Sequence, residues 1–377
     1  MNARALWLDQ LTDEEAAILE RRVPQQLDRR PDVLVIGGGV VGVATAVACL
    51  RAGLGSIMLL ERHRLGAGAT GGAAGLLIPE AHQGTDPGAM VDLGRSSLSL
   101  WRELEAAWPG GVGLADLDWL GLEPHPPGFA ADQASGAEWL DPREVARLVP
   151  GLARPAAGVF IHHQARVNPL RAVARLAARL PSVVTGVAAL AAIIRGDRLL
   201  SVSTSAGEVS PGAVIFATGG PPDLHGLELT VPAGHVKGHL LATEPAPFRL
   251  PGTVAPLATQ LEDGRLLVGG TLDTEDDSPA VRPEVIASLW SALRAALPAV
   301  GGLRISHQWC CFRPTHPDSL PVIDRVPGLA NAWVTSGHFR TGVLLAPATG
   351  RALATWMSTD RQPAEIAGLG LGRLGAS

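Results

Sequence analysis

The stretch "PDVLVIGGGVVGVATAVACLRAGLGSIMLLER", residues 31–62, changes its hydrophobic periodicity in the middle. Val33–Ile36 form a short apolar run, which is typical of a fully buried parallel strand. Small and apolar residues then continue to Leu50, which predicts one helix, and Gly53 is expected to end it. The run "SIMLLE" predicts a second buried strand that ends in Glu61. The order strand, helix, strand indicates an α/β fold.

Three glycines between the first strand and the helix form the pattern G-x-G-x-x-G. Gly37 permits a tight turn, Gly39 lets the backbone approach a pyrophosphate, and Gly42 lets the helix pack close to the strand. Glu61 follows at about the 20-residue spacing at which a carboxylate binds a pair of ribose hydroxyls. The combination predicts a dinucleotide-binding site. The alternative is a glycine turn with only a structural role.

The composition narrows the class of protein. A chain of 377 residues is long enough for two domains, and its 46% hydrophobic and 18% charged residues indicate a folded globular protein. The net charge of −5 gives no electrostatic reason to expect nucleic acid or an anionic membrane as a partner. The cysteines, Cys49, Cys310 and Cys311, have neither disulfide nor metal spacing, so we expect no metal site and a reducing compartment. No apolar run reaches the ~18 residues of a membrane span.

The first 30 residues differ in character from the rest of the chain. They begin "MNARALWLDQLTDEEAAILERR", whose acidic residues and lack of a hydrophobic segment do not fit a secretory signal. From Thr12 the pattern predicts a short amphipathic helix, so we expect residues 1–30 to form an N-terminal helical extension outside the main domain. We expect a cytoplasmic protein, and leave open whether it forms a homo-oligomer.

The segment after Glu61 bears on which dinucleotide is bound. It reads "RHRLGAGATGGAAGLLIP" and is rich in Gly, Ala and Thr. Such a run can lay backbone amides along an extended ligand, where larger side chains would clash. A flexible loop is the alternative that composition alone leaves open.

Six motifs, in order over residues 31–357, extend these observations. They are "VIGGGVVG", "GGAAGLL", "VIFATGG" (214–220), "GRLLVGGTL" (264–272), "FRPTHPDSLPVID" (312–324) and "GHFRTGVLLAPATG" (337–350). With them the chain resembles the FAD-dependent D-amino-acid oxidase family, most closely its glycine oxidase branch. The resemblance implies an α/β (α+β overall) fold, with a Rossmann-like FAD-binding domain and an inserted antiparallel-sheet substrate domain. The FAD-binding domain should comprise 31–100, 160–228 and 305–377, and the substrate domain 101–159 and 229–304.

The resemblance also implies a set of FAD contacts. In the family the "GHFRTG" segment wraps the flavin, and the helix that begins near Thr341 points its positive end at the flavin pyrimidine. The expected cofactor-binding residues are Gly37, Gly39, Val40, Val41, Gly42, Glu61, Arg62, Ala69, Thr70, Ala74, Gly75, Leu76, Val187, Gly219, His338, Phe339, Arg340, Thr341, Gly342, Val343 and Leu344.

Two arginines are the expected catalytic and substrate-binding residues. By the resemblance, Arg313 binds the substrate α-carboxylate, for which a guanidinium offers two parallel hydrogen bonds. Arg340 matches a position beside the substrate. The alternative for Arg313 is a buried structural ion pair with Asp318 or Asp324.

The sequence departs from the glycine oxidase pattern at two positions. Leu257 stands where that branch has a tyrosine that assists carboxylate binding, so the pocket should be more apolar. His235 or His239 could substitute for the phenol, or could be ordinary structural histidines. Cys311 stands two residues before Arg313, where the monomeric sarcosine oxidase branch bonds a cysteine to the flavin. We expect non-covalent FAD, with a link at Cys311 as the alternative.

The function that the resemblance implies is FAD-dependent oxidative deamination of a small amino acid or N-alkyl amino acid. Hydride passes from Cα to flavin N5, the imine hydrolyses, and dioxygen is reduced to hydrogen peroxide, so the protein mainly orients the substrate. A second G-x-G-x-x-G with C-x4-C is absent, so the electrons should come from the bound substrate rather than from NADPH. The alternatives are a dye- or quinone-linked D-amino acid dehydrogenase and a non-catalytic flavin-binding subunit or sensor.

Overall fold

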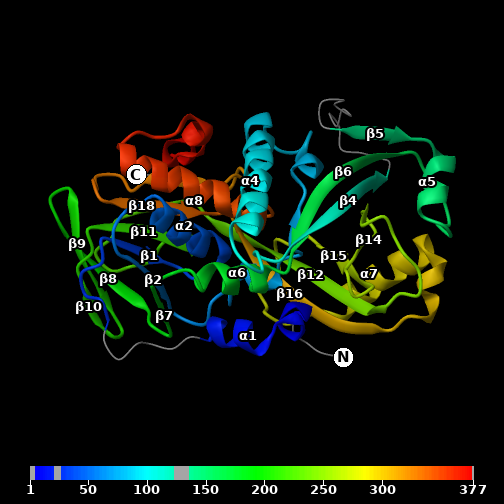
Figure 1. Ribbon diagram of the computed structural model, residues 1–377, viewed down its shortest axis with the longest axis horizontal. Helices are drawn as coiled ribbons and strands as arrows, with labels where there is room; N and C mark the ends of the chain where they lie inside the picture. Colours follow the sequence, from blue (N-terminus) through cyan, green and yellow to red (C-terminus); the bar gives the residue numbers. More distant parts are fainter. Residues whose placement is uncertain (1–4, 21–26, 123–135, 376–377) are drawn as a thin grey trace.

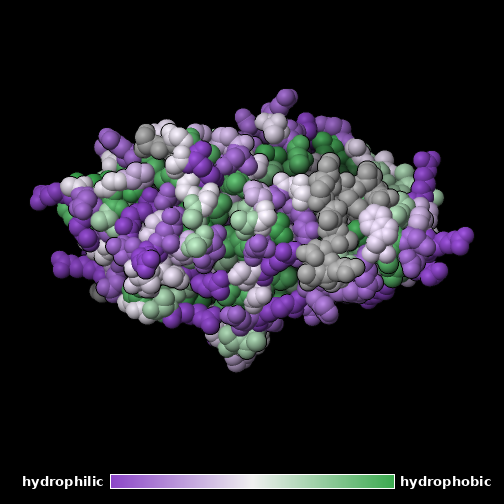
Figure 2. Space-filling model, turned by 90° about the horizontal axis from the view of Figure 1, so that it is seen from above, coloured by the Kyte–Doolittle hydropathy of each residue, from purple (hydrophilic) through white to green (hydrophobic). Residues whose placement is uncertain are grey.

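The computed structural model describes residues 5–20, 27–122 and 136–375. In Figure 1 a parallel sheet with its helices occupies one half of the molecule, and a large, mostly antiparallel sheet occupies the other. Hydrophilic side chains project from both ends of the face shown in Figure 2, whereas hydrophobic residues appear mainly in its central part. Within the described ranges, no helix has the length and apolar character that a bilayer crossing requires.

The parallel sheet has six strands among the described residues, in the order β17-β18-β11-β1-β2-β7. Its centre confirms the strand–helix–strand prediction, with β1 (Val33–Ile36), α2 (Val40–Arg51) and β2 (Ile57–Glu61). Only β17 runs antiparallel, at the edge. All four residues of β1 are buried, as expected for a strand covered on both faces. The other strands are β7 (Ser182–Thr185), β11 (Ala213–Gly219), β17 (Val322–Arg325) and β18 (Ala332–Ser336).

Helices cover one face of this sheet and a small sheet covers the other. Helix α8 (Gly342–Thr359) packs directly on α2, and a Cβ atom at Gly350 would lie only 2.9 Å from the Ala44 carbonyl oxygen. Helix α4 (Gly88–Ala107) packs against α8, and α6 (Pro169–Ala177) against α2 (Figure 1). The opposite face shares a hydrophobic cluster with β8 (Ala189–Arg195), β9 (Arg198–Thr204) and β10 (Gly207–Val209).

The second large sheet has nine described strands. Eight follow the order β16-β12-β15-β14-β13-β4-β6-β3, with β5 paired to β6. Its pairings are antiparallel except that of β13 with β4. Residues of α5 (Pro142–Leu148) and α7 (Pro283–Ala296) share a hydrophobic cluster with it. The strands are β3 (Leu76–Leu77), β4 (Leu114–Leu122), β5 (Ala137–Leu140), β6 (Gly158–Val167), β12 (Gly234–Pro245), β13 (Thr253–Ala255), β14 (Ala258–Gln260), β15 (Arg265–Gly269) and β16 (Ile305–Thr315).

These sheets show the α/β class expected from the sequence, while the exact division into domains stays a prediction. Three strands that fall wholly or mostly in the expected cofactor-binding segments, β3, β6 and β16, pair inside the nine-stranded sheet. The remaining short elements are η1 (Leu6–Gln10), α1 (Asp13–Leu19), α3 (Ala69–Gly72), η2 (Pro79–His82), η4 (Pro298–Gly302), η5 (Ala364–Leu369) and η6 (Leu371–Leu374).

The N-terminal segment forms the predicted helix but is packed differently from our expectation. Thr12 begins α1 with a reciprocal capping box to Glu15. Leu6, Trp7 and Leu19 are buried in the same hydrophobic cluster as the core of α2 and α8. The described part of the segment is therefore not outside the main domain, because its apolar side chains complete that core.

Candidate active site

A cavity of about 1130 Å³ opens between the two large sheets. It is lined by the glycine turn after β1, the segment after β2, the end of β11, the segment Thr253–Thr259 and the "HFR" turn before α8. The volume exceeds the roughly 300–1,000 Å³ of sites for drug-sized ligands, so it suits a dinucleotide together with a small substrate. The cavity lies beyond the carboxyl ends of parallel strands, where α/β sheets bind ligands.

Most of the predicted cofactor residues line this cavity. They are Gly37, Gly39, Val40, Val41, Glu61, Arg62, Ala69, Thr70, Ala74, Gly75, Leu76, Val187, Gly219, His338, Phe339, Arg340, Gly342 and Val343. Three others do not: Gly42, Thr341 and Leu344 lie behind the lining. A Cβ atom at Gly42 would lie 2.0 Å from the Gly37 carbonyl oxygen, so that glycine serves helix–strand packing.

The part of the cavity beside the glycine turn has the features of a dinucleotide-binding site. Gly37 has φ +120°, and a Cβ atom there would lie 2.2 Å from the Ala217 carbonyl oxygen. Glu61 accepts hydrogen bonds from the backbone amides of Gly38 (2.6 Å) and His63 (2.7 Å), which hold its carboxylate at the end of β2. The positive end of α2 begins at Gly39, which has no side-chain cap.

A buried hydroxyl at the end of β18 was missed by our sequence reasoning. Thr335 lines the cavity, and its Oγ1 atom is buried with no hydrogen-bond partner in the described parts of the chain. A buried hydroxyl of this kind calls for a ligand or water partner. The sequence signal was available, because Thr335 stands two residues before the motif of residues 337–350, which the resemblance assigns to the flavin.

The turn before α8 is held by its own contacts. His338 is buried, and its Nε2 atom lies 3.1 Å from Thr349 Oγ1. Burial, and secondarily the nearby His316, lowers the pKa of His338 from its ordinary 6.5 to about 3, so the ring is neutral. Trp101 Nε1 donates to the Val343 carbonyl (3.1 Å), which fixes the first turn of α8 at the cavity.

Arg313 is a partly buried cation that faces the cavity. Its Nη1 atom donates to the Thr271 carbonyl oxygen at 2.9 Å, and burial lowers the pKa of the guanidinium. No carboxylate among the described residues forms an ion pair with it. The structural alternative is wrong, because Asp318 binds Arg373 Nε at 2.7 Å and Asp324 accepts the Leu371 amide at 2.7 Å.

Arg340 lies at a more open part of the cavity. Its Nη2 atom is 3.8 Å from Asp86 Oδ1, and its guanidinium lies over the Phe339 ring at 5.5 Å. Burial raises the pKa of Asp86, but the hydrogen bond and charge of His82 and the charge of Arg340 outweigh it and lower the pKa. The Asp86 carboxylate therefore stays ionised and forms a long ion pair with Arg340.

Part of the cavity lining is apolar. Leu257 is among the lining residues, together with Ile78, Trp119, Leu240 and Leu267. His235 and His239 do not line the cavity, so neither replaces the missing phenol. His235 binds Asp277 at 2.8 Å, and His239 Nε2 accepts the Arg282 amide at 3.1 Å.

Cys311 faces the cavity from β16. Its Sγ atom donates to the Gly72 carbonyl at 3.4 Å, and burial raises the pKa of the thiol. A protonated thiol is a poor nucleophile. Cys310 points to the other face of the strand, where its Sγ donates to the Pro279 carbonyl.

Two tryptophans hold the Gly72–Ala73 backbone from behind the cavity. Trp309 Nε1 donates to the Gly72 carbonyl at 3.1 Å, and Trp7 Nε1 donates to the Ala73 carbonyl at 2.8 Å. Both Gly72 and Ala73 line the cavity. Through Trp7, the N-terminal segment thus supports a part of the cavity lining.

A fold with this cavity and these nucleotide-binding features defines a flavin-dependent oxidoreductase. The chain belongs to the DAO family of FAD-dependent oxidoreductases, whose family model matches residues 32–356. It is therefore an FAD-dependent enzyme of the group that acts on amino acids or amines. It is similar to the glycine oxidase of Pseudomonas aeruginosa, at 30% identity over 88% of this chain and 95% of that protein. It is also similar to a putative thiamine biosynthesis oxidoreductase, ThiO, of Rhizobium etli, at 29% identity over 87% of this chain and 97% of that protein.

Solved structures agree with this fold. The glycine oxidase of Geobacillus kaustophilus has a TM-score of 0.79, with 23% identity, 91% of this chain and 98% of that chain covered. The L-amino acid deaminase of Proteus myxofaciens has a TM-score of 0.82 at 15% identity, with 94% and 95% covered. At such identities the likeness establishes the fold alone.

Proposed function

We propose that this enzyme catalyses the oxidative deamination of a small amino acid or N-alkyl amino acid, with dioxygen as the electron acceptor and hydrogen peroxide as a product. The observation that carries the proposal is Arg313. A partly buried guanidinium in the cavity, with no ion pair among the described residues, calls for an anion from outside the chain. A substrate carboxylate provides that anion in a bidentate geometry.

The other residues have positioning roles in this proposal. Bound FAD would supply the hydride acceptor, held at the glycine turn, Glu61 and the first turn of α8. Arg313 binds and orients the substrate carboxylate, and Arg340 adds a second positive charge at the open side. Leu257 and Trp119 exclude water and contact the substrate's side chain or N-alkyl group. The raised pKa of the Cys311 thiol supports non-covalent FAD.

The test is an anaerobic screen of the purified holoenzyme. Amino acids of both configurations and N-alkyl amino acids are added, and loss of the flavin absorbance near its visible maximum reports reduction. Air is then admitted, and peroxide is assayed. Reduction by an amino acid with fast reoxidation in air supports the proposal, whereas slow reoxidation in air with fast dye reduction identifies a dehydrogenase. No reduction by any amine indicates a non-catalytic flavoprotein and contradicts the proposal.

Acid precipitation tests the form of the cofactor. Flavin released to the supernatant supports non-covalent binding. Flavin that stays in the pellet of the unmodified protein, but not in that of Cys311→Ser, identifies a bond to this cysteine instead.

A further inference from the structure

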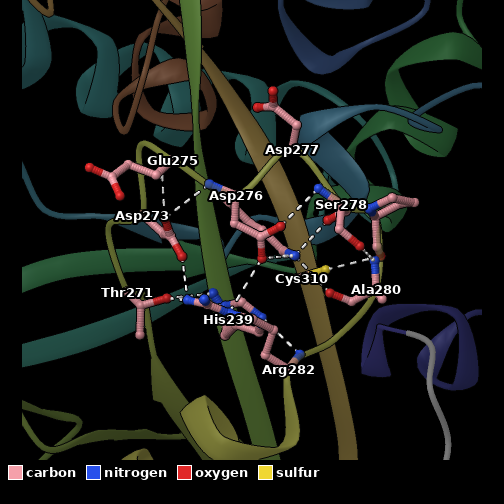
Figure 3. A network of polar contacts seen from close by, with 12 residues as sticks. His239, Thr271, Asp273, Glu275, Asp276, Asp277, Ser278, Ala280, Arg282 and Cys310 are labelled. Carbon is pink, nitrogen blue, oxygen red and sulfur yellow. Dashed lines mark hydrogen bonds and ion pairs between the residues drawn. The ribbon is translucent and has the colours of Figure 1, made fainter.

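The segment Thr271–Arg282, which connects β15 to α7, is fastened to β12 by a polar network around the buried Lys237 and His239 (Figure 3). We infer that Lys237 and Asp276 in this network are positioning residues for Arg313. Through the Thr271–Arg282 segment, they set the orientation in which Arg313 meets a substrate carboxylate. The inference rests on the proposed role of Arg313 in binding that carboxylate.

Lys237 is the only lysine of the chain and is fully buried. Its Nζ atom donates to Asp276 Oδ2 at 2.7 Å and to the carbonyl oxygens of Ser278 (2.5 Å) and Ala280 (2.7 Å). All three donors of the ammonium group are thus used. Its backbone and that of Asp273 exchange two hydrogen bonds, of 2.7 and 2.9 Å. One residue of β12 therefore holds the segment at four points.

His239, two residues further along β12, holds the two ends of the segment. Its backbone amide donates to Thr271 Oγ1 at 2.8 Å, and its Nε2 atom accepts the Arg282 amide at 3.1 Å. Burial, followed by the charges of Lys237 and Arg282, lowers the pKa of His239, so the neutral ring is the acceptor. Because side chains alternate along a strand, Lys237 and His239 share one face of β12 and Gly238 has the other.

The network ends at Arg313. The Thr271 carbonyl accepts a hydrogen bond of 2.9 Å from Arg313 Nη1, the one hydrogen bond that this guanidinium makes within the described ranges. The guanidinium also lies against Gly238, between the two residues that fasten the segment. A shift of the segment would move the Thr271 carbonyl, and with it the plane of the guanidinium. Bidentate carboxylate binding depends on that plane.

The network is poorly explained by stability alone. Burying the Lys237 ammonium group costs desolvation energy that offsets most of its attraction to the partly exposed Asp276 carboxylate, so this ion pair adds little net stability. A network in which every donor of Lys237 has a defined acceptor does, however, specify one arrangement of the segment. A single fixed arrangement of the segment is what the orientation of the Arg313 guanidinium requires.

The experiment measures carboxylate binding without turnover. Acetate and benzoate are titrated into the holoenzyme, and the perturbation of the flavin spectrum gives their dissociation constants. We expect Lys237→Met and Asp276→Asn each to raise these constants at least tenfold while changing FAD affinity less than twofold. Arg304→Met is the matched control, because it removes an exposed ion pair with Glu244 at the other end of the β12–β16 pairing, and it should leave both constants unchanged.

The variant Arg313→Met distinguishes a failure of the proposed function from a failure of the positioning role of Lys237 and Asp276. If this variant binds carboxylates as the unmodified protein does, the proposed role of Arg313 is wrong. If it binds them weakly but Lys237→Met and Asp276→Asn do not, the positioning role is overturned while the proposed function stands. The double variant Lys237→Met/Arg313→Met should bind no more weakly than Arg313→Met alone, because residues that act through one group are not additive. Should Lys237→Met fail to fold, Asp276→Asn decides, since Asp276 is partly exposed.

Discussion

The guanidinium of Arg313 lies where a side chain at residue 238 would stand. A Cβ atom at Gly238 would be 2.2 Å from the Nη2 atom of Arg313. The guanidinium lies close to β12 at this residue, and a Cβ atom at Gly270 would be 3.8 Å from its Nη2 atom. The absence of a side chain at residue 238 is therefore what lets Arg313 reach its place in the lining.

Gly238→Ala should weaken carboxylate binding without unfolding the protein. The added methyl group meets the far end of a flexible side chain, which can move, so stability should change little. We expect about a tenfold higher dissociation constant for acetate, equivalent to about 1.4 kcal/mol. Gly301→Ala, where the added Cβ meets nothing within 4 Å, is the control. Unchanged acetate binding in Gly238→Ala would show that Arg313 does not bind carboxylates from this position.

Arg313→Ala should abolish activity or raise KM while FAD stays bound. Losing one charge-assisted bidentate contact costs about 3 kcal/mol, or roughly a hundredfold in kcat/KM. Steady-state kinetics on the best substrate from the anaerobic screen provide the measurement. Arg351→Ala, which removes an exposed contact with Ser96, should behave as the unmodified enzyme. Unaltered kinetics in Arg313→Ala would mean that the carboxylate binds elsewhere or that the substrate has none.

Leu257 should favour substrates larger than glycine. It offers aliphatic surface in the cavity, and each buried methylene contributes about 0.8 kcal/mol. We expect larger D-amino acids or N-alkyl amino acids to exceed glycine in kcat/KM. Leu257→Tyr should move the preference back towards glycine. Peroxide or dye-reduction rates across a substrate series, for both proteins, measure the shift. A wild type that already prefers glycine contradicts this role for Leu257.

His338 should make the folded protein sensitive to acid. Its pKa of about 3 lies below the ordinary 6.5, so the unfolded chain binds a proton that the folded chain does not. The stability of the neutral buried ring is fully present above pH 6.5 and is lost progressively as the pH falls from 6.5 towards 3. The slope is about 1.4 kcal/mol per pH unit. His338→Gln should lose stability less steeply over this range.

Urea unfolding at pH 7.5, 6 and 4.5 measures that difference. Replacing the exposed His225 by Gln provides the control, and it should keep the pH dependence of the unmodified protein. Parallel curves for the wild type and His338→Gln would show that His338 accepts a proton in the folded state.

Trp7→Phe should weaken FAD binding, although Trp7 lies outside the cavity. The variant keeps an aromatic ring in the core but leaves the Ala73 carbonyl without the indole donor. The loss of one hydrogen bond is worth about 1 kcal/mol, or roughly fivefold in the dissociation constant of FAD. Flavin fluorescence during titration of the apoprotein measures it. Trp356→Phe alters a buried tryptophan of the same core cluster that does not line the cavity, and should change stability only. Equal FAD affinities of the wild type and Trp7→Phe would show that the hydrogen bond from Trp7 to Ala73 does not contribute to FAD binding.

The first nucleotide-binding unit was predictable because its information is local. Three features could be recognised from adjacent residues alone: the apolar run Val33–Ile36, the backbone requirement of the glycine turn, and the periodicity of the helix to Leu50. The capping box at Thr12 is local in the same way. Strand partners are not local. Nothing in the residues of β16 indicates that it pairs with β12 rather than with the parallel sheet.

The residues of the candidate site could likewise be predicted where the signal is local, and could not be predicted where it depends on distant segments. The roles of the glycine turn and the "HFR" segment follow from residue types that few other positions require. The burial of Lys237 could not be predicted, because lysine is usually exposed and its partners lie 39 to 43 residues away. The Thr335 hydroxyl, which has no hydrogen-bond partner in the described part of the chain, and the indole of Trp7 become meaningful only when a cavity wall is assembled from distant segments.

The central sheet takes β1, β11 and β18 from widely separated parts of the chain, and the hydrogen bond from Ser97 Oγ to the Leu344 carbonyl spans 247 residues. Translation adds about 5–20 residues each second, so β1 leaves the ribosome on the order of ten seconds or more before β11, and longer before β18. During that time an apolar strand, buried on both faces in the finished protein, has an unpaired edge in a nascent chain, which is a hazard for aggregation. The recovery of this enzyme from cells should therefore depend on the chaperones that meet the chain during synthesis, more than on how firmly the completed molecule resists unfolding.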